Sequence, residues 1–205
     1  MVIHCLKSGL KTFKNMNDIE YLKNLVLAPY ILKARALIQV QRKVGGNQFR
    51  HVFSTLGILL DYEYFSDSVL LKASLLHDFL EDLKETTVEE IRGIDNEGPQ
   101  VVKLVLEVTK LHTETKEQYL QRVLNDGSPN ALILKCADRI SNLTDLNRDT
   151  HSNQKISDYL DQTEKFVLPM AQKAEENMFI ELSDLIARRW EIVRMTEELK
   201  TKGIN

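Results

Sequence analysis

The stretch LLHDFLED at residues 75–82 sets four polar side chains into an apolar run. A helix buries such a run, and an ionised carboxylate inside it is costly unless a positive group pairs with it. Two more potential ligands, His51 and Asp138, join His77 and Asp78 to make two imidazoles and two carboxylates. A divalent cation is the simplest positive partner for this set. The sequence therefore predicts a metal centre built on helices.

Helical periodicity extends over most of the remaining chain. The 205 residues include only 8 Gly and 4 Pro, and 43% of them are hydrophobic, which favours helices over a turn-rich β architecture. Residues 1–17 show only weak periodicity. We expect a single all-α domain, a helical bundle over residues 29–200, preceded by a leader and a first short helix over residues 1–28.

Caps and breakers place the expected helices. Pro29 begins a helix that Gly45-Gly46-Asn47 ends, and Thr87 and Glu90 have the spacing of a capping box. Pro169 is expected to kink a later helix, and residues 147–155 are expected to form a loop. The longer helices expected from the periodicity cover about 29–44, 49–60, 67–83, 98–109, 117–125, 130–146, 155–177 and 180–200.

The composition argues against several classes of partner. The net charge is −3 and the chain has no concentrated basic stripe, so we expect no nucleic-acid partner. Cys5 and Cys136 make neither a disulfide framework nor a CxxC zinc site. No apolar run reaches the roughly 20 residues that span a bilayer, and the N-terminus lacks a signal-peptide core. We therefore expect a cytoplasmic protein without a membrane partner.

The spacing of the polar residues indicates the chemistry. Positions 77, 78, 81 and 82 fall on one side of a helix, and Asp138 and Asn142 are again one turn apart. Mixed imidazole and carboxylate ligation suits Mn²⁺, Fe²⁺ or Zn²⁺ better than Ca²⁺. Such a metal activates water toward a phosphoryl group, and Glu81 and Asp82 would orient or deprotonate that water. The pattern favours a metal-dependent hydrolase, although each stretch alone also fits a buried histidine or a salt-bridged helix.

The ordered set of polar residues resembles the HD-domain phosphohydrolases, and more closely the (p)ppGpp hydrolase domain of the RelA/SpoT homologues. The similarity covers roughly residues 30–175. The matching segments, in chain order, are RKVGG at 42–46, LLHDFLED at 75–82, VTKL at 108–111, CADRISNL at 136–143 and LPMA at 168–171.

This resemblance implies an HD-type helical bundle that uses Mn²⁺ to remove the 3′-pyrophosphate of ppGpp or pppGpp. The products would be GDP or GTP and pyrophosphate, and the activity would lower alarmone levels in the stringent response. Family members often carry a synthetase domain after the hydrolase, and we expect this chain to be a stand-alone hydrolase. The implied metal ligands are His51, His77, Asp78 and Asp138. The implied catalytic pair is Glu81 and Asp82, and the residues implied to hold the nucleotide are Arg42, Lys43 and Asn142.

Departures from the family pattern keep alternatives open. Val52 follows His51 where the family usually has proline, and SNLTD at 141–145 puts Thr144 in place of a basic residue. The substrate could then be another nucleotide such as NADPH, or the chain could be a non-catalytic alarmone-binding module. The Arg42-Lys43 pair could also be a solvated helix end, and Arg139 a structural ion-pair partner of a nearby acid. The sequence leaves open the oligomeric state, the physiological metal and the preference between ppGpp and pppGpp.

Overall fold

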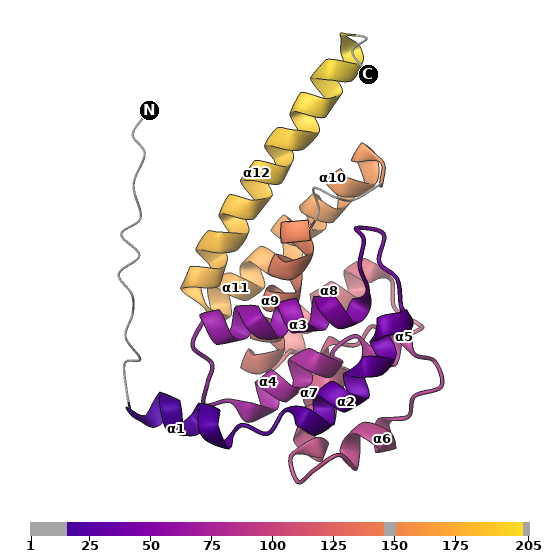
Figure 1. The fold of residues 1–205 in the computed structure, drawn as a ribbon. Helices are drawn as coiled ribbons and strands as arrows, with labels where there is room; N and C mark the ends of the chain where they lie inside the picture. The colour runs from indigo at the N-terminus through magenta and orange to yellow at the C-terminus, as the bar shows by residue number, and fades with distance from the viewer. Residues whose placement is uncertain (1–15, 146–150, 203–205) are drawn as a thin grey trace.

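Helices make up every regular element in the part of the chain that the structure describes, residues 16–145 and 151–202. This computed structural model confirms the expected all-α, single-domain fold (Figure 1). Residues 1–15 of the expected leader and 147–150 of the expected loop lie outside the described residues. No helix within the described ranges has both the length and the apolar character to cross a membrane.

The elements follow one another with short connections. In chain order they are α1 (Met16–Asn24), α2 (Ala28–Ala34), the 3₁₀ helix η1 (Arg35–Gln39), α3 (Gln48–Asp61), α4 (Ser68–Leu76), α5 (Phe79–Asp82), α6 (Val88–Arg92), α7 (Gly98–Val108), α8 (Lys116–Asp126), α9 (Pro129–Asp145), α10 (Asn153–Gln162), the π-helix η3 (Thr163–Val167), α11 (Leu168–Ala174) and α12 (Glu176–Thr201).

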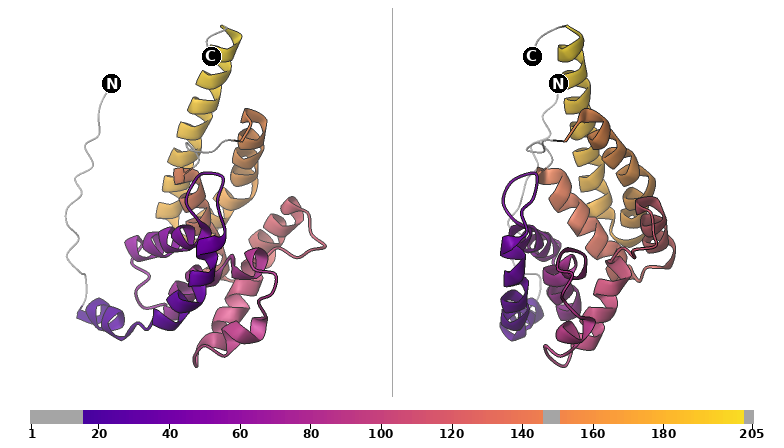
Figure 2. Two further views of the ribbon diagram at one scale, coloured as in Figure 1. Left: turned by 45° about the vertical axis from the view of Figure 1, so that its right-hand side comes forward. Right: turned by 90° about the vertical axis from the view of Figure 1, so that its right-hand side faces the viewer.

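The centre of the bundle is α9. It packs against α3, α7, α11 and α12, and nearly every residue from Ala131 to Leu143 is buried. Figure 2 shows α9 between the N-terminal helices and the C-terminal pair α11 and α12. Next to it, α4 is buried all the way from Leu70 to Leu76 because α2, α3 and α7 surround it. Polar residues of α3, of the end of α4 and of α9 are therefore held inside the bundle.

The helix expected over residues 67–83 is wrong in its middle. α4 ends at Leu76 and α5 begins at Phe79, so His77 and Asp78 form a turn between two helices. Adjacent residues of a continuous helix point about 100° apart. The turn lets both side chains point toward the same cluster of potential ligand atoms. A hydrogen bond from His77 Nδ1 to the carbonyl oxygen of Ser74, 2.7 Å away, ties the turn to α4.

The helix expected over residues 29–44 is also shorter than predicted. It tightens into η1, ends at Gln39, and gives way to a loop closed by an isolated bridge between Gln41 and Asn47. Gly45 and Gly46 have φ values of +87° and +73°, a left-handed conformation that favours glycine. Arg42 and Lys43 therefore lie on a tight loop, and the interpretation of this pair as a solvated helix end is wrong.

The C-terminal third differs from expectation in where its helices begin and end: α10 begins at Asn153, inside the expected loop, and α12 begins at Glu176. The single kinked helix expected over 155–177 is a series of α10, the π-turn of η3, and α11. Pro169 lies in the first turn of α11, where a missing N–H group is tolerated. The last helix, α12, packs on α9, α10 and α11 and then extends past the body of the bundle (Figure 1).

One local signal is confirmed at the start of a short helix. Thr87 and Glu90 form the expected capping box at the start of α6. Cys136 is buried in α9 as a small core residue with a free thiol.

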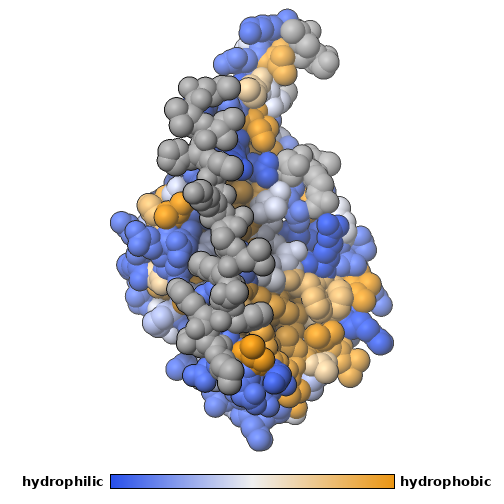
Figure 3. Space-filling model, turned by 60° about the vertical axis from the view of Figure 1, so that its left-hand side comes forward, coloured by the Kyte–Doolittle hydropathy of each residue, from blue (hydrophilic) through white to orange (hydrophobic). Residues whose placement is uncertain are grey.

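One face of the molecule also carries exposed apolar side chains (Figure 3). The exposed large apolar residues of the N-terminal segment include Ile19, Val26, Leu32 and Ile38.

Candidate metal centre

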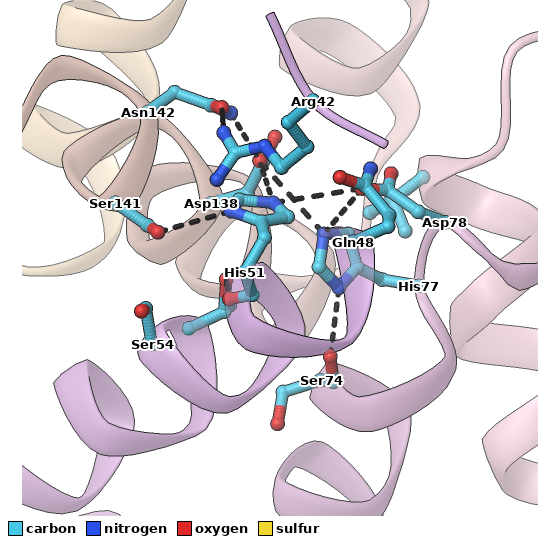
Figure 4. A network of polar contacts seen from close by, with 12 residues as sticks. Arg42, Gln48, His51, Ser54, Ser74, His77, Asp78, Asp138, Ser141 and Asn142 are labelled. Carbon is cyan, nitrogen blue, oxygen red and sulfur yellow. Dashed lines mark hydrogen bonds and ion pairs between the residues drawn. The ribbon is translucent and has the colours of Figure 1, made fainter. Parts of the chain in front are cut away.

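Three segments that are far apart in the sequence bring four side chains to one point. His51 comes from α3, His77 and Asp78 from the turn between α4 and α5, and Asp138 from α9. Each offers one ligand atom, and these atoms all lie within 4.8 Å of one another. Figure 4 shows the side chains pointing toward each other. The structure therefore brings together the four residues that the sequence predicted as metal ligands.

Hydrogen bonds set the orientation of the two imidazoles. His77 is 3% exposed, and its Nδ1–H donates to the carbonyl oxygen of Ser74, which leaves Nε2 facing the centre. His51 is 1% exposed; its Nδ1 lies 3.0 Å from Ser141 Oγ and its Nε2 3.1 Å from Asp138 Oδ1. Such outer contacts fix which nitrogen of a histidine is presented to a metal.

The two carboxylates are held just as firmly. Asp138 accepts bonds of 2.6 Å from both Lys135 Nζ and Asn142 Nδ2, and Asp78 Oδ2 accepts a 2.7 Å bond from Gln48 Nε2. Burial disfavours the ionised form of Asp78, but the charge and hydrogen bond of His77 and the charge of His51 together outweigh it and lower the pKa of Asp78 to about 2. For Asp138, burial is outweighed by the charge of Lys135 together with the two histidines, which hold the pKa of this carboxyl well below its usual range. Both groups are ionised near neutral pH.

The donor set fits a divalent metal. His77 Nε2 is buried without a hydrogen-bond partner within the described residues, at 3.3 Å from Asp78 Oδ2 and 3.8 Å from Asp138 Oδ1. A buried polar atom without a partner carries a cost that a bound metal would remove. Two imidazoles and two carboxylates, each already oriented by a neighbour, are the ligand types that first-row divalent metals take.

The acidic pair that follows the turn is divided between two environments. Glu81 lines a cavity of about 230 Å³ together with Asp78 and Asp138, and its Oε1 accepts a 2.7 Å bond from the backbone N–H of Lys110. Asp82 is half-buried and does not line that cavity. Burial, and then the charge of Asp78, raise the pKa of Asp82 to about 6. Glu81 is thus the acid that can reach a reactant in the cavity.

The predicted nucleotide-binding residues meet beside the metal ligands. Arg42 Nη2 donates to Asn142 Oδ1 at 2.6 Å, and Arg42 Nη1 lies 3.4 Å from Asp145 Oδ2. A second cavity, of about 320 Å³, opens here, and it shares Asn142 and Tyr159 with the cavity at the metal ligands. The residues lining this second cavity are Arg42, Lys43, Val44, Asn142, His151, Lys155, Ile156 and Tyr159.

Sequence reasoning missed several residues of the site and misassigned one. Gln48 and Ser141 lie three residues from predicted ligands on the same helices, a spacing that could have identified them. Lys155 and Tyr159, four residues apart on α10, carried no such signal. The ion-pair role considered for Arg139 is wrong within the described residues: its guanidinium stacks on the Tyr159 ring, with 4.0 Å to the centroid, and donates to Thr163 Oγ1 at 2.8 Å.

Comparisons with known proteins point to one family. A family model described as HD domain matches residues 29–173. The Mus musculus protein named guanosine-3′,5′-bis(diphosphate) 3′-pyrophosphohydrolase MESH1 is 36% identical over 124 residues, covering 57% of this chain and 67% of the mouse protein. The Homo sapiens protein of that name is 35% identical over 137 residues, 62% of this chain and 74% of the human protein.

A solved structure agrees with these relatives. It is described as a metazoan ortholog of SpoT that hydrolyses ppGpp and plays a role in starvation responses. Its TM-score with this chain is 0.68 at 25% sequence identity, and the match covers 87% of this chain and 98% of the other.

Proposed function

This chain belongs to the HD domain family, and on that premise we propose that it hydrolyses ppGpp and pppGpp at the 3′ position with Mn²⁺. The products are GDP or GTP and pyrophosphate, and the reaction lowers alarmone levels in the stringent response. The observation that carries this proposal is the convergence of His51, His77, Asp78 and Asp138, whose ligand atoms lie within 4.8 Å of one another. They lie beside a cavity whose wall includes Asp78, Glu81 and Asp138. Relatives named as 3′-pyrophosphohydrolases of ppGpp support the choice of substrate.

The four ligands would hold the metal at the buried end of the cavity. When bound, a divalent metal polarises a phosphoryl oxygen and lowers the pKa of water close to it. Mn²⁺ is the ion we propose because two carboxylates and two imidazoles suit it, and because the RelA/SpoT-type resemblance implies it. Hydrogen bonds from neighbouring residues keep these ligands oriented. The neighbours are Lys135, Asn142, Gln48, Ser74 and Ser141.

Glu81 acts on the attacking water. Its carboxylate faces the cavity and is fixed by the backbone N–H of Lys110, so it can orient a water molecule and accept its proton. The water oxygen bonds to the phosphorus next to the ribose while the bond from that phosphorus to O3′ breaks. O3′ takes up a proton and leaves as the hydroxyl of GDP or GTP.

The second cavity is where we place the nucleoside. Arg42 and Lys43 supply positive charge, and the ring of Tyr159 and the side chains of Val44 and Ile156 supply apolar surface for a base. Asn142 belongs to both cavities and donates to Asp138 while it accepts from Arg42. It can therefore align the sugar between the base and the reacting phosphorus.

The dinucleotide alternative rests on Thr144. Its hydroxyl bonds to the carbonyl oxygen of Ile140 within α9, and its own carbonyl oxygen accepts from Arg189, so this position adds no charge for a phosphate. A substrate with a different phosphate arrangement, such as NADPH, would not need that charge.

The binding-module alternative is weaker, because Glu81 and all four ligands are present. The buried, free thiol of Cys136 suits the reducing, cytoplasmic setting that we propose.

The test is hydrolysis of ppGpp by the purified protein with Mn²⁺ and with excess chelator, the products being separated by anion exchange. GDP and pyrophosphate formed only with metal are expected. Turnover of NADPH in place of ppGpp would favour the alternative substrate. Tight ppGpp binding without any product would overturn the enzymatic assignment.

A further inference from the structure

Three cationic side chains that the mechanism above leaves unused as substrate contacts line the cavity at the metal ligands. Lys116 is the first residue of α8, and Lys135 and Arg139 lie one turn apart on α9. We call these three residues the cation wall. None of the residues proposed to hold the nucleoside belongs to it, so the wall requires its own explanation.

The cation wall is short of negative partners. Lys135 pairs with Asp138 at 2.6 Å, but that carboxylate is also a proposed metal ligand. Arg139 is 1% exposed, makes no ion pair within the described residues, and its Nε is buried without a hydrogen-bond partner. A buried guanidinium without an anion is costly. Its unused N–H group indicates that an anion completes the site.

The third member shows the same excess of positive charge. Lys116 is an exposed residue, yet its ammonium group lies 5.3 Å from the centroid of the Tyr119 ring at the cavity. Burial of that group, and then the charges of Lys135 and Arg139, lower the pKa of Lys116 to about 8. The positive charges of the three residues therefore act on one another at the cavity, and the carboxylates of Asp138 and Glu81 offset them only in part.

The net charge of the cavity points to the kind of anion. Its lining includes three carboxylates, from Asp78, Glu81 and Asp138, and three cations, those of the cation wall. These charges cancel, so a divalent metal leaves the cavity with a net charge of +2. α8 supplies part of the wall but no metal ligand. The anion site therefore extends beyond the metal ligands, as a diphosphate requires.

We propose that the cation wall binds the outer phosphate of the substrate's 3′-diphosphate and retains it as pyrophosphate after the bond to O3′ breaks. This inference rests on the proposed function and fixes the orientation of the substrate. The nucleoside occupies the cavity of about 320 Å³ with Arg42 and Lys43, and the diphosphate occupies the cavity of about 230 Å³. Inorganic pyrophosphate is then a product inhibitor that competes with substrate, and orthophosphate binds more weakly.

The experiment compares Lys116→Gln with the wild-type protein and with Lys103→Gln. Lys103 is an exposed lysine of α7 and controls for the loss of one charge. Pyrophosphate and orthophosphate binding are measured by calorimetry on the Mn²⁺-loaded protein at fixed free Mn²⁺, alongside kcat and KM for ppGpp. We expect Lys116→Gln to weaken pyrophosphate binding about tenfold and to raise KM. We expect Lys116→Arg to retain the pyrophosphate affinity and the KM of the wild-type protein. Mn²⁺ affinity and Tm should be unchanged in both variants.

The outcomes separate this inference from the proposed function. Unchanged pyrophosphate binding by Lys116→Gln, in a protein that still hydrolyses ppGpp, overturns the inference and leaves the function intact. If the wild-type protein does not hydrolyse ppGpp, the proposed function fails. In that case selective loss of pyrophosphate binding in Lys116→Gln still supports the diphosphate site, and unchanged binding still overturns it.

Discussion

Arg42 and Asn142, a hundred residues apart in the sequence, form a 2.6 Å hydrogen bond between the guanidinium and the side-chain amide oxygen. The same amide donates to Asp138 through its nitrogen. The loop with positive-φ glycines is thereby joined to the helix that carries a metal ligand. The side chain of Asn142 therefore connects the position of the loop to the position of the metal ligand Asp138.

Replacing Arg42 by alanine should impair substrate binding more than chemistry. The guanidinium is proposed to contact the nucleotide and also positions Asn142, so we expect KM for ppGpp to rise about tenfold, with a smaller loss of kcat. Arg35→Ala removes an exposed arginine from η1 and should change neither constant. Steady-state kinetics check this, and a pure kcat effect would contradict the assigned role.

Metal binding should release a proton from His77. Burial opposes protonation of this imidazole in the metal-free protein, but the charges of Asp78 and Asp138 outweigh it and raise its pKa to about 10. A metal must displace that proton, so its apparent affinity should rise about tenfold per pH unit between pH 6.5 and 8.5. Calorimetry in two buffers of different ionisation enthalpy measures the release. His112→Gln, at an exposed histidine, should leave it unchanged, and a buffer-independent heat would refute the prediction.

Glu81→Gln should reduce kcat by about 100-fold or more, because the amide cannot accept the proton of the attacking water. The bond to the backbone N–H of Lys110 can still form through the amide oxygen, so Tm and Mn²⁺ affinity should not change. Glu85→Gln makes the same chemical change at an exposed position and should retain full activity. Wild-type turnover by Glu81→Gln would remove Glu81 from the mechanism.

The contribution of Asp82 to the stability of the metal-free protein should be lost as the pH rises from about 4 to about 6. The folded-state pKa of Asp82 is raised to about 6 from 3.8, so the folded protein binds a proton in this window that the unfolded chain releases. Asp82→Asn removes the titration. Its Tm relative to wild type should therefore increase over this window, as measured by thermal unfolding in chelator. A constant difference in Tm would contradict the raised pKa.

Two glycine-to-alanine substitutions should have opposite effects on the free energy of unfolding. Gly45 has a φ of +87°, and an alanine there would be strained by roughly 1–2 kcal/mol although no atom lies within 4 Å of the added Cβ. Gly57 lies inside α3 with the same free space, and alanine there should stabilise the protein by about 0.5–1 kcal/mol. Denaturant unfolding measures both. If both substitutions changed the free energy of unfolding in the same direction, the positive φ of Gly45 would not be what requires glycine in the loop.

Much of the architecture was readable from periodicity and breakers. Apolar residues at helical spacing, with caps such as Thr87 and Glu90, predicted an all-α fold, and the structure confirms it. The four predicted ligands also come together. They could be recognised in the sequence because a polar residue inside an apolar run is unfavourable unless it has a partner, so its presence there indicates a functional role.

The sequence by itself determined that the chain folds into helices and which polar residues interrupt the apolar pattern, because these are properties of neighbours along the chain. Only the tertiary structure decided that the helix breaks at His77, that Arg42 reaches Asn142, and that Arg139 lies on Tyr159 instead of pairing with an acid. Each of these depends on groups brought together by packing around α9. Such contacts leave no periodic trace in the sequence, since their partners are set by the path of the chain through space.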